Sequence, residues 1–296
     1  GLDSQYDFRT QRFATSTQSD PNGFYREQIV RSMQYSGEFL FRYTHDFAHD
    51  INLTANLGGS IVNRQYERHQ QWADNLKNPG VYTLANAASL VKTDNYLEKR
   101  QTNSLYALVQ LSWRNAIFLD VTGRNDWSST LPAKNRSYFY PSVSGSVVIN
   151  ELADFGSKNG ILNLFKVRGS WAQVGHDTKP YRIEEYLQST AFPGNVTTQS
   201  AKVNGMLLPE KVASWEIGVD LRMFRNRLNL DMAYYNSKTT NALASMPVSA
   251  SAGMGSVYTN AGSIHNHGFE IQALGTIIRT KDIRWNVTAN WSINRN

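Results

Sequence analysis

Hydrophobic and polar residues alternate one by one through several stretches of the chain. In the segment RWNVTANWSIN, residues 284–294, every second residue is apolar and the residues between are polar. Successive side chains of a β-strand point to opposite faces, so this segment is predicted to be a strand with one apolar and one polar face. The same pattern recurs in INLTANLGGSI, SLYALVQLSW, SWEIGVDLRM, RLNLDMAYYN and FEIQALGTII.

This periodicity predicts an all-β chain with about eleven strands. Helical periodicity is nearly absent, and the best candidate is a turn or two of helix within 150–163. The predicted strands cover approximately 4–13, 28–45, 50–65, 97–113, 116–124, 138–149, 164–175, 214–224, 227–237, 267–278 and 284–294.

The predicted connections differ in length in a regular way. Tight turns are expected at HDFAH (45–49), at Arg-Asn pairs (114–115 and 225–226) and at RTKDI (279–283). Short and long connections nearly alternate, with the 150–163 linker among the short set as the exception. In an up-and-down barrel, this order places all short turns at one end. Transmembrane β-barrels show this asymmetry, whereas a Greek-key sandwich has no reason to sort its loops. The long connections are expected at about 66–96, 125–137, 176–213 and 238–266.

The apolar faces favour a membrane barrel over a soluble sandwich. Strands of about ten residues suit a tilted crossing of the hydrocarbon layer. Five tryptophans fall on apolar faces, several near strand ends, as an interfacial aromatic girdle requires. These are Trp113, Trp171, Trp215, Trp285 and Trp291. The alternative is a soluble all-β carbohydrate-binding or adhesive module, which would need no detergent.

Composition narrows the picture further. The chain has 296 residues, no cysteine and a net charge of +6. A disulfide framework and a zinc-thiolate site are therefore excluded. The positive charge is spread along the chain, which indicates solvated loops and a polar lumen rather than nucleic-acid binding. No stretch approaches 18 apolar residues, and the N-terminal segment lacks the regions of a signal peptide.

Candidate catalytic and metal-binding motifs have simpler interpretations. HDFAH imitates a zinc motif that requires a helix, but it joins two predicted strands, so a polar turn is favoured. His265 and His267 share a strand face but lack a third ligand. The pair Glu184 and Glu185 lies in a long connection as solvated carboxylates. GMGS (253–256) lacks the context of a nucleotide loop, and we predict neither an enzyme nor a bound cofactor or metal.

The motif GRNDWSSTLP (123–132) is the most distinctive loop segment. Arg124, Asn125, Asp126 and Trp127 are candidates to contact a substrate at the mouth of a barrel. The favoured interpretation is a structured loop base, because Asn-Asp starts turns and Pro132 ends one.

Five further segments stand out by their residues, order and spacing. They are VTGRNDWSSTLP (121–132), SYFYPSVSGSVVINEL (137–152), FKVRGSWAQVG (165–175), SWEIGVDLRMFRNRLNLDMAYYNSKT (214–239) and NAGSIHNHGFEIQ (260–272). Together these motifs resemble the barrel of the SusC/RagA family of TonB-linked outer-membrane proteins. The resemblance covers most of the chain from about residue 28 onward. Small departures are Ala172 and His176, where Gly and Asn are expected, and His267 in place of a common Lys.

The resemblance implies a fold, a location and partners. The eleven strands would form roughly half of a 22-stranded transmembrane up-and-down β-barrel with a plugged lumen, in the outer membrane of Bacteroidota. It also implies import of oligosaccharides or peptides, driven through TonB, beneath a SusD-like surface lipoprotein. Residues 1–296 would then be a partial barrel in contact with outer-membrane lipid. The plug, the TonB box and the signal peptide have no counterpart here, so we expect a piece of a longer protein.

Aromatic residues in the predicted long connections are candidates for substrate contacts. Flat rings suit the apolar faces of sugars and amides suit hydroxyls, which favours a glycan over a peptide. The same rings could pack on the neighbouring lipoprotein, and anchoring a loop is the commoner role for any one of them. The preferred candidates are Trp72, Trp127, Tyr181, Tyr186 and Tyr258, and the wider set adds Tyr82, Tyr96 and Phe192.

Overall fold

The computed structural model describes residues 1–14, 22–153, 161–189, 195–249, 251 and 253–296. Within these residues, eleven strands form one sheet, and the order of the strands in the sheet is their order along the chain. Three short strands that lie outside this sheet occur in the chain between β7 and β11, and two occur between β12 and β15. The prediction of about eleven strands is confirmed. Their bounds are β1 (Leu2–Phe13), β2 (Phe24–Phe47), β3 (Ile51–Ala73), β4 (Lys92–Trp113), β5 (Ile117–Ser128), β6 (Ser137–Val148), β7 (Leu162–His176), β11 (Glu210–Met223), β12 (Leu228–Thr240), β15 (Ser263–Arg279) and β16 (Arg284–Arg295).

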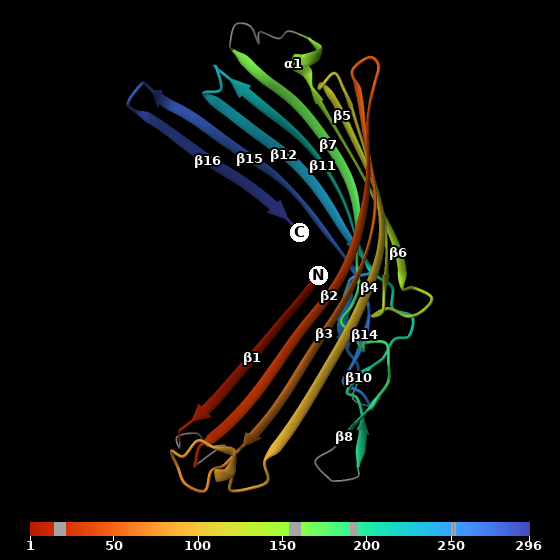
Figure 1. Ribbon diagram of the computed structural model, residues 1–296, viewed down its shortest axis with the longest axis vertical. Helices are drawn as coiled ribbons and strands as arrows, with labels where there is room; N and C mark the ends of the chain where they lie inside the picture. The colour runs from red at the N-terminus through yellow and green to blue at the C-terminus, as the bar shows by residue number, and fades with distance from the viewer. Residues whose placement is uncertain (15–21, 154–160, 190–194, 250, 252) are drawn as a thin grey trace. The chain divides into compact units, whose positions relative to one another are not determined.

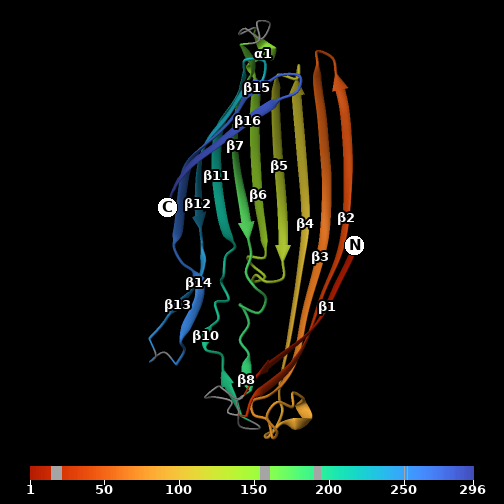
Figure 2. The same cartoon turned by 90° about the vertical axis from the view of Figure 1, so that its left-hand side faces the viewer.

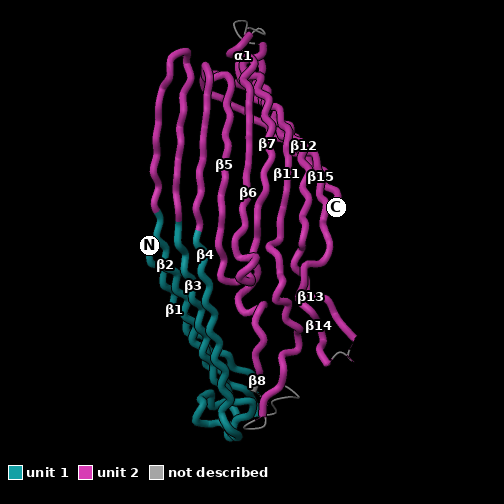
Figure 3. The backbone as a smooth tube through the Cα atoms, turned by 90° about the vertical axis from the view of Figure 1, so that its right-hand side faces the viewer, with its two compact units in different colours: residues 1–38, 60–103 teal, residues 39–59, 104–296 magenta. Residues whose placement is uncertain are grey.

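The chain divides into two compact units (Figure 3). Unit 1 comprises residues 1–38 and 60–103, and unit 2 comprises residues 39–59 and 104–296. Strands β2, β3 and β4 contribute a segment to each unit. Within unit 1, β1 pairs with β2 in antiparallel register. Within unit 2, each long strand pairs with the next in antiparallel register, in the order β5, β6, β7, β11, β12, β15 and β16.

Short turns gather at one end of unit 2 and long connections at the other (Figures 1 and 2). Three of the turns contain consecutive residues with positive φ, at His49–Asp50, at Arg114–Asn115 and at Phe224–Asn226, which suits hairpin turns between twisted strands. In a fourth, the amide of Thr280 donates to the carbonyl of Ile283 at 2.8 Å, and the amide of Ile283 donates to Thr280 Oγ1 at 3.0 Å. The long connections span 129–136, 177–209 and 241–262. The predicted sorting of connections is therefore confirmed in this unit, with the expected exception of the connection 149–161 between β6 and β7, whose described part lies at the end of the short turns.

The predicted ends of two long connections were wrong. The connection expected at 66–96 covers only 74–91, because β3 continues to Ala73 and β4 begins at Lys92. The connection expected at 125–137 covers 129–136, because β5 continues to Ser128. Both faces of β3 and β4 are polar near these ends, so backbone pairing continues where the hydrophobic alternation has stopped.

The long connections carry short elements that periodicity does not reveal. A three-stranded sheet runs in the order β10, β14, β13, and β8 pairs with β9. The helix expected within 150–163 is present as α1 (Ile149–Leu152), while 154–160 lie outside the described residues. The other short elements are η1 (Leu84–Asn86), β8 (Leu187–Ser189), β9 (Val196–Thr198), β10 (Ala201–Lys202), β13 (Leu243–Pro247) and β14 (Ser256–Asn260).

Strand register in unit 2 lines up aromatic side chains along the apolar face. Trp171 of β7 lies directly opposite Trp215 of β11, whose ring centroid is 5.4 Å from that of Tyr234 in β12. Farther along the sheet, the rings of Phe269 and Trp291 are 6.1 Å apart. An aromatic row across five strands is what an interfacial girdle requires, and its apolar neighbours remain exposed on this face.

Buried apolar residues are few. In unit 1, Ala73, Leu76 and Ala87 form a small cluster below the ends of β3 and β4, and Tyr25 and Tyr82 pack against it. No helix among the described residues is long and apolar enough to cross a membrane. The sheet therefore exposes its large apolar side chains instead of enclosing them in a core.

Candidate functional site

The face of the sheet opposite the aromatic row, called here the polar face, carries ionised side chains on several neighbouring strands of unit 2. The register places Asp120 opposite Ser144, Ser144 opposite Ser170, and Ser170 opposite Glu216. Because paired residues point to the same side, this face is polar across four adjacent strands. The faces predicted from alternation are confirmed.

An arginine with three acidic partners lies on this polar face. Arg168 Nη2 donates to Asp231 Oδ1 at 2.7 Å, and Nη1 donates to Asp220. Glu216 lies 3.6 Å from Arg168 Nε. One cation on β7 thus joins carboxylates on β11 and β12, and the group keeps a net negative charge.

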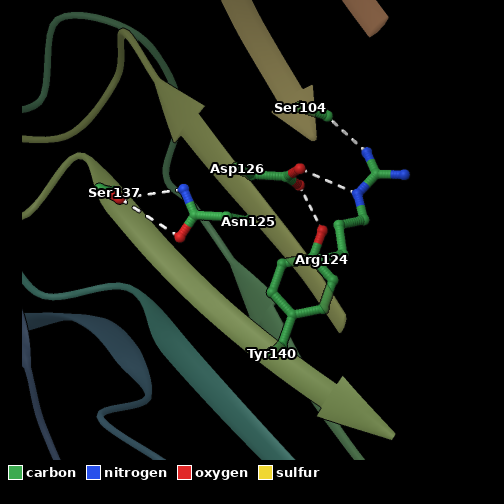
Figure 4. A network of polar contacts seen from close by, with 6 residues as sticks. All are labelled: Ser104, Arg124, Asn125, Asp126, Ser137 and Tyr140. Atoms are coloured by element: carbon green, nitrogen blue, oxygen red, sulfur yellow. Dashed lines mark hydrogen bonds and ion pairs between the residues drawn. The ribbon is translucent and has the colours of Figure 1, made fainter. Parts of the chain in front are cut away.

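A second network lies on the polar face near the long connections (Figure 4). Arg124 Nε donates to Asp126 Oδ1 at 2.8 Å, and Nη2 donates to Ser104 Oγ at 2.9 Å. Tyr140 donates its hydroxyl to the same aspartate, and the guanidinium lies 5.6 Å from the ring centroid of Tyr106. The motif residues Arg124 and Asp126 are therefore held in place by β4 and β6.

The other two residues of that motif lie on the opposite face. Asn125 Nδ2 donates to Ser137 Oγ at 3.0 Å, and Figure 4 shows this pair turned away from Arg124. Trp127 is opposite Ser137 in the register and is 38% exposed. It therefore belongs to β5 and to the apolar side of the sheet, so its predicted position in a loop was wrong.

A buried carboxylate ties together two long connections of unit 2. Asp177 is 3% exposed, and its Oδ2 accepts hydrogen bonds from Ser128 and, at 3.0 Å, from Thr130. Both hydroxyl-bearing residues are themselves buried. Buried polar groups are stable only when paired, so this network fixes the base of the 177–209 connection against β5.

The long connections of unit 2 also bind one another. Asn135 Nδ2 donates to the carbonyl of Leu207 at 3.1 Å. The amide of Leu208 donates to Asn260 Oδ1 at 2.9 Å, and Asn260 Nδ2 donates back to its carbonyl. The Arg182 guanidinium lies 4.4 Å from the ring centroid of Tyr258. These segments form an ordered loop cluster of residues 129–136, 177–189, 195–209 and 256–260.

In unit 1, the side of β3 that carries Arg64, Tyr66 and Arg68, called here the polar face of unit 1, has a tyrosine pair of its own. The rings of Tyr66 and Tyr96 meet edge to face with centroids 6.1 Å apart. Arg68 lies 5.6 Å from the centroid of Tyr96, and the Tyr96 hydroxyl donates to Glu98 Oε2 at 2.8 Å. Arg64 Nε donates to Gln34 Oε1 at 2.8 Å on the neighbouring strand. Rings and charges therefore alternate on one side of β3 and β4.

The structure disperses the predicted substrate-contacting aromatics. Trp72 lies in β3 and Tyr96 in β4, so their predicted positions in a loop were wrong, and both belong to unit 1. In unit 2, Tyr181 and Tyr186 lie in the loop cluster and are 39% and 50% exposed. Tyr258, in β14, accepts a hydrogen bond from Thr178. Tyr82 packs against the apolar cluster of unit 1, and Phe192 lies outside the described residues.

The histidine motifs have polar neighbours. His49 and Asp50 have positive φ in the turn between β2 and β3, which confirms that HDFAH leads into a turn. His265 and His267 share a face with ring centroids 5.8 Å apart, and His265 contacts Asn236. Within the described ranges, no group of three or more His, Cys, Asp or Glu residues has the arrangement of a metal site.

These features define the class of protein. One face of the sheet is apolar with an aromatic row, the other is polar, and the connections are sorted by length, as in the wall of a transmembrane β-barrel. The chain belongs to the family described as "TonB dependent receptor-like, beta-barrel", whose model matches residues 1–295. It is accordingly an outer-membrane protein, and the soluble alternative is wrong.

Individual relatives agree with this family. The chain is 27% identical over 281 residues to TonB-dependent receptor P39 of Formosa agariphila, which covers 92% of this chain and 26% of the relative. It is 25% identical over 242 residues to TonB-dependent receptor SusC of Bacteroides thetaiotaomicron, covering 78% of this chain and 23% of SusC. The chain thus spans about a quarter of the length of these relatives.

Solved structures support the fold. A structure of the RagAB peptide transporter superposes with a TM-score of 0.87 at 22% identity, covering 99% of this chain and 33% of that chain. The outer-membrane transporter YddB from Escherichia coli superposes with a TM-score of 0.56 at 10% identity. The eleven strands therefore correspond to part of a receptor barrel, and the resemblance to SusC and RagA found in the sequence is confirmed.

Proposed function

We propose that the complete protein imports oligosaccharides across the outer membrane by a TonB-dependent mechanism. The observation that carries the proposal is the polar face, on which tyrosine rings lie beside arginine–carboxylate pairs in both units. Stacking surfaces combined with fixed donors and acceptors suit molecules that have apolar ring faces and many hydroxyls. Family membership supplies the barrel in which such a face would line the path of a ligand.

The proposal includes two protein partners. A SusD-like surface lipoprotein would cover the end that carries the long connections, and TonB would act through a plug segment. The similarity to SusC and the ordered loop cluster support this arrangement. The exposed rings of Tyr181 and Tyr186 would contact either the ligand or this lipoprotein, with Tyr258 bracing the cluster between them.

The five candidate residues take different roles in this proposal. Trp72, by alternation on the same side of β3 as Arg68, would contact ligand from the wall. Trp127, on the apolar side, would anchor the barrel at the lipid interface. The proposal assigns no catalytic step to any residue.

Peptide import is the competing function. The superposed RagAB structure is titled as a peptide transporter, and at 22% identity this likeness supports the shared fold. On the polar face of unit 1, two arginines and two carboxylates line one cleft and their charges cancel. This lining favours an uncharged ligand over a peptide with charged termini.

Uptake by whole cells tests the proposal. Cells producing the complete protein with its lipoprotein would receive fluorescently labelled neutral oligosaccharides or labelled peptides of similar mass. We expect accumulation of an oligosaccharide that stops when a protonophore dissipates the proton-motive force. Accumulation of peptides alone would replace the glycan importer with a peptide importer, and uptake insensitive to the protonophore would remove the TonB-dependent mechanism.

A further inference from the structure

Unit 1 contains a cleft on its polar face. The cleft has a volume of about 320 Å³, at the lower end of the usual size for ligand sites. It is open along the sheet and crosses all four strands of the unit. Its principal lining residues are Asp3, Gln34, Arg64, Tyr66, Glu98 and Arg100.

The surrounding strand segments indicate that this cleft lies in water. On β3, residues 63–71 carry Asn, Gln, Glu, His and Gln on one side and Arg, Tyr, Arg and Gln on the other. On β4, residues 94–103 are similarly polar on both sides, with Leu97 as the exception. A charged residue facing lipid at the membrane midplane costs about 2–4 kcal/mol, so segments of this composition belong outside the hydrocarbon layer.

The cleft holds a fixed aromatic surface. Tyr66 lines it, and Tyr96 meets Tyr66 edge to face at 6.1 Å. Tyr96 is 40% exposed, and its orientation is set by Glu98 and by Arg68 over its ring. Side chains that are already ordered lose little conformational entropy when a ligand binds.

Donors and acceptors flank the rings. Arg64 donates to Gln34, Arg68 donates to Asp94 at 2.8 Å, and Arg68 Nε is buried with no hydrogen-bond partner among the described residues. Planar guanidinium, amide and carboxylate groups can each bridge two neighbouring hydroxyls of one ring. A buried donor without a partner gains stability from any acceptor that reaches it.

The charges of the lining cancel. The lining contains two arginines, Arg64 and Arg100, and two carboxylates, Asp3 and Glu98, so the formal sum is zero. A sulfated or uronic glycan would require a surplus of cations, and a charged peptide terminus would find no surplus of the opposite charge. The lining therefore matches an uncharged ligand with apolar ring faces.

We propose that this cleft in unit 1 binds an uncharged oligosaccharide, with Tyr66 as the stacking platform and Tyr96 as its support. The proposal deepens the function proposed above and rests on it. It identifies the cleft in unit 1 as a subsite for the ligand, and it specifies that the ligand is uncharged.

Binding to the complete detergent-purified protein tests the subsite. The probes are maltoheptaose, laminarihexaose and xylohexaose as neutral ligands, oligogalacturonate as an anionic ligand, and tryptic casein peptides, each followed by calorimetry. We expect at least one neutral probe to bind, with an affinity that changes less than about twofold between 50 and 500 mM salt, because no net charge is screened.

Matched variants locate the binding. Tyr66→Ala should weaken the affinity for the neutral probe about tenfold or more, as for a central aromatic contact, whereas Tyr66→Phe should keep it. Tyr6→Ala is the control, since Tyr6 lies in β1 of the same unit, is exposed, and points to the opposite side from Gln5, which lines the cleft. Tyr96→Ala, a second variant, should weaken binding even if Tyr66→Ala fails to fold.

The outcomes separate the subsite from the wider function. If a neutral probe binds but Tyr66→Ala and Tyr96→Ala behave like Tyr6→Ala, the cleft is not the site, while the glycan importer stands. If only peptides or oligogalacturonate bind, or no neutral probe binds, the uncharged ligand class is overturned together with the subsite.

Discussion

The guanidinium of Arg168 lies so close over Gly218 that a β-carbon at position 218 would be 2.6 Å from Nε and 2.7 Å from Cζ. Gly218 is opposite Arg168 in the register of β7 and β11. The missing side chain leaves a passage across β11, through which Arg168 reaches Asp231 on β12. The absence of a side chain at Gly218 thus permits an arginine of β7 to reach across β11 and bind an aspartate of β12.

Gly218→Ala is therefore expected to destabilise the barrel. The added methyl group displaces the guanidinium and weakens its hydrogen bonds, at a cost of about 1–3 kcal/mol, typical of overpacking. The measurement is the urea concentration at which the complete protein loses its folded mobility on a gel. Gly169→Ala is the control, because its β-carbon would meet nothing closer than 3.9 Å. Equal effects of the two substitutions would contradict the role given to Gly218.

Substitution by arginine should distinguish the two faces of β4. Val109 alternates with Gln110, whose side chain donates to Asp120 on the polar face. Val109→Arg places a charge against lipid and should cost about 2–4 kcal/mol near the midplane. Gln110→Arg gains Asp120 as a partner and should cost much less. Unfolding from lipid vesicles gives both values, and the reverse order would show that the faces are inverted.

Removing the buried carboxylate of Asp177 should loosen the loop cluster. Asp177→Ala leaves the hydroxyls of Ser128 and Thr130 without this acceptor, a loss of about 1–3 kcal/mol that falls on the base of the connection. Trypsin should then cut faster after Arg182, as followed by mass spectrometry. Glu184→Ala, an exposed change in the same connection, should leave the rates unchanged. Unchanged cleavage in Asp177→Ala would refute the anchoring role.

Two tryptophans are expected to affect different measurements. Trp127→Ala removes the indole ring from the apolar side and should lower the free energy of unfolding by about 1–2 kcal/mol without changing ligand affinity. Trp72→Ala should weaken ligand binding and leave stability nearly unchanged. Calorimetric binding and urea unfolding of both variants provide the comparison. A loss of affinity in Trp127→Ala would return that residue to the ligand site.

The strands and their faces could be predicted because alternation in the sequence follows directly from strand geometry. The ends of β3 and β4 could not, since residues 63–71 and 94–103 are polar on both sides and carry no alternating signal. In these segments the backbone ladder alone continues the strand.

The candidate site was only partly predictable for a related reason. The motif around Arg124 and Asp126 is visible in the sequence, but its partners Ser104 and Tyr140 are supplied by the register of other strands. The pair of Tyr66 and Tyr96 likewise joins residues thirty positions apart in sequence, through packing between strands. The sequence could therefore suggest single candidate residues, whereas the pairing of strands determines which of these residues contact one another.

The unequal ends of unit 2 have a consequence for how such a protein can diversify. A turn such as Arg114–Asn115 fixes the register of its hairpin, and one inserted residue there would exchange the two faces of a strand. A long connection tolerates insertion, because doubling its length adds only about 0.6 kcal/mol of closure entropy. New residues can therefore accumulate in the long connections while the strands and their two faces stay constant, so the connections and the membrane-spanning sheet can evolve independently.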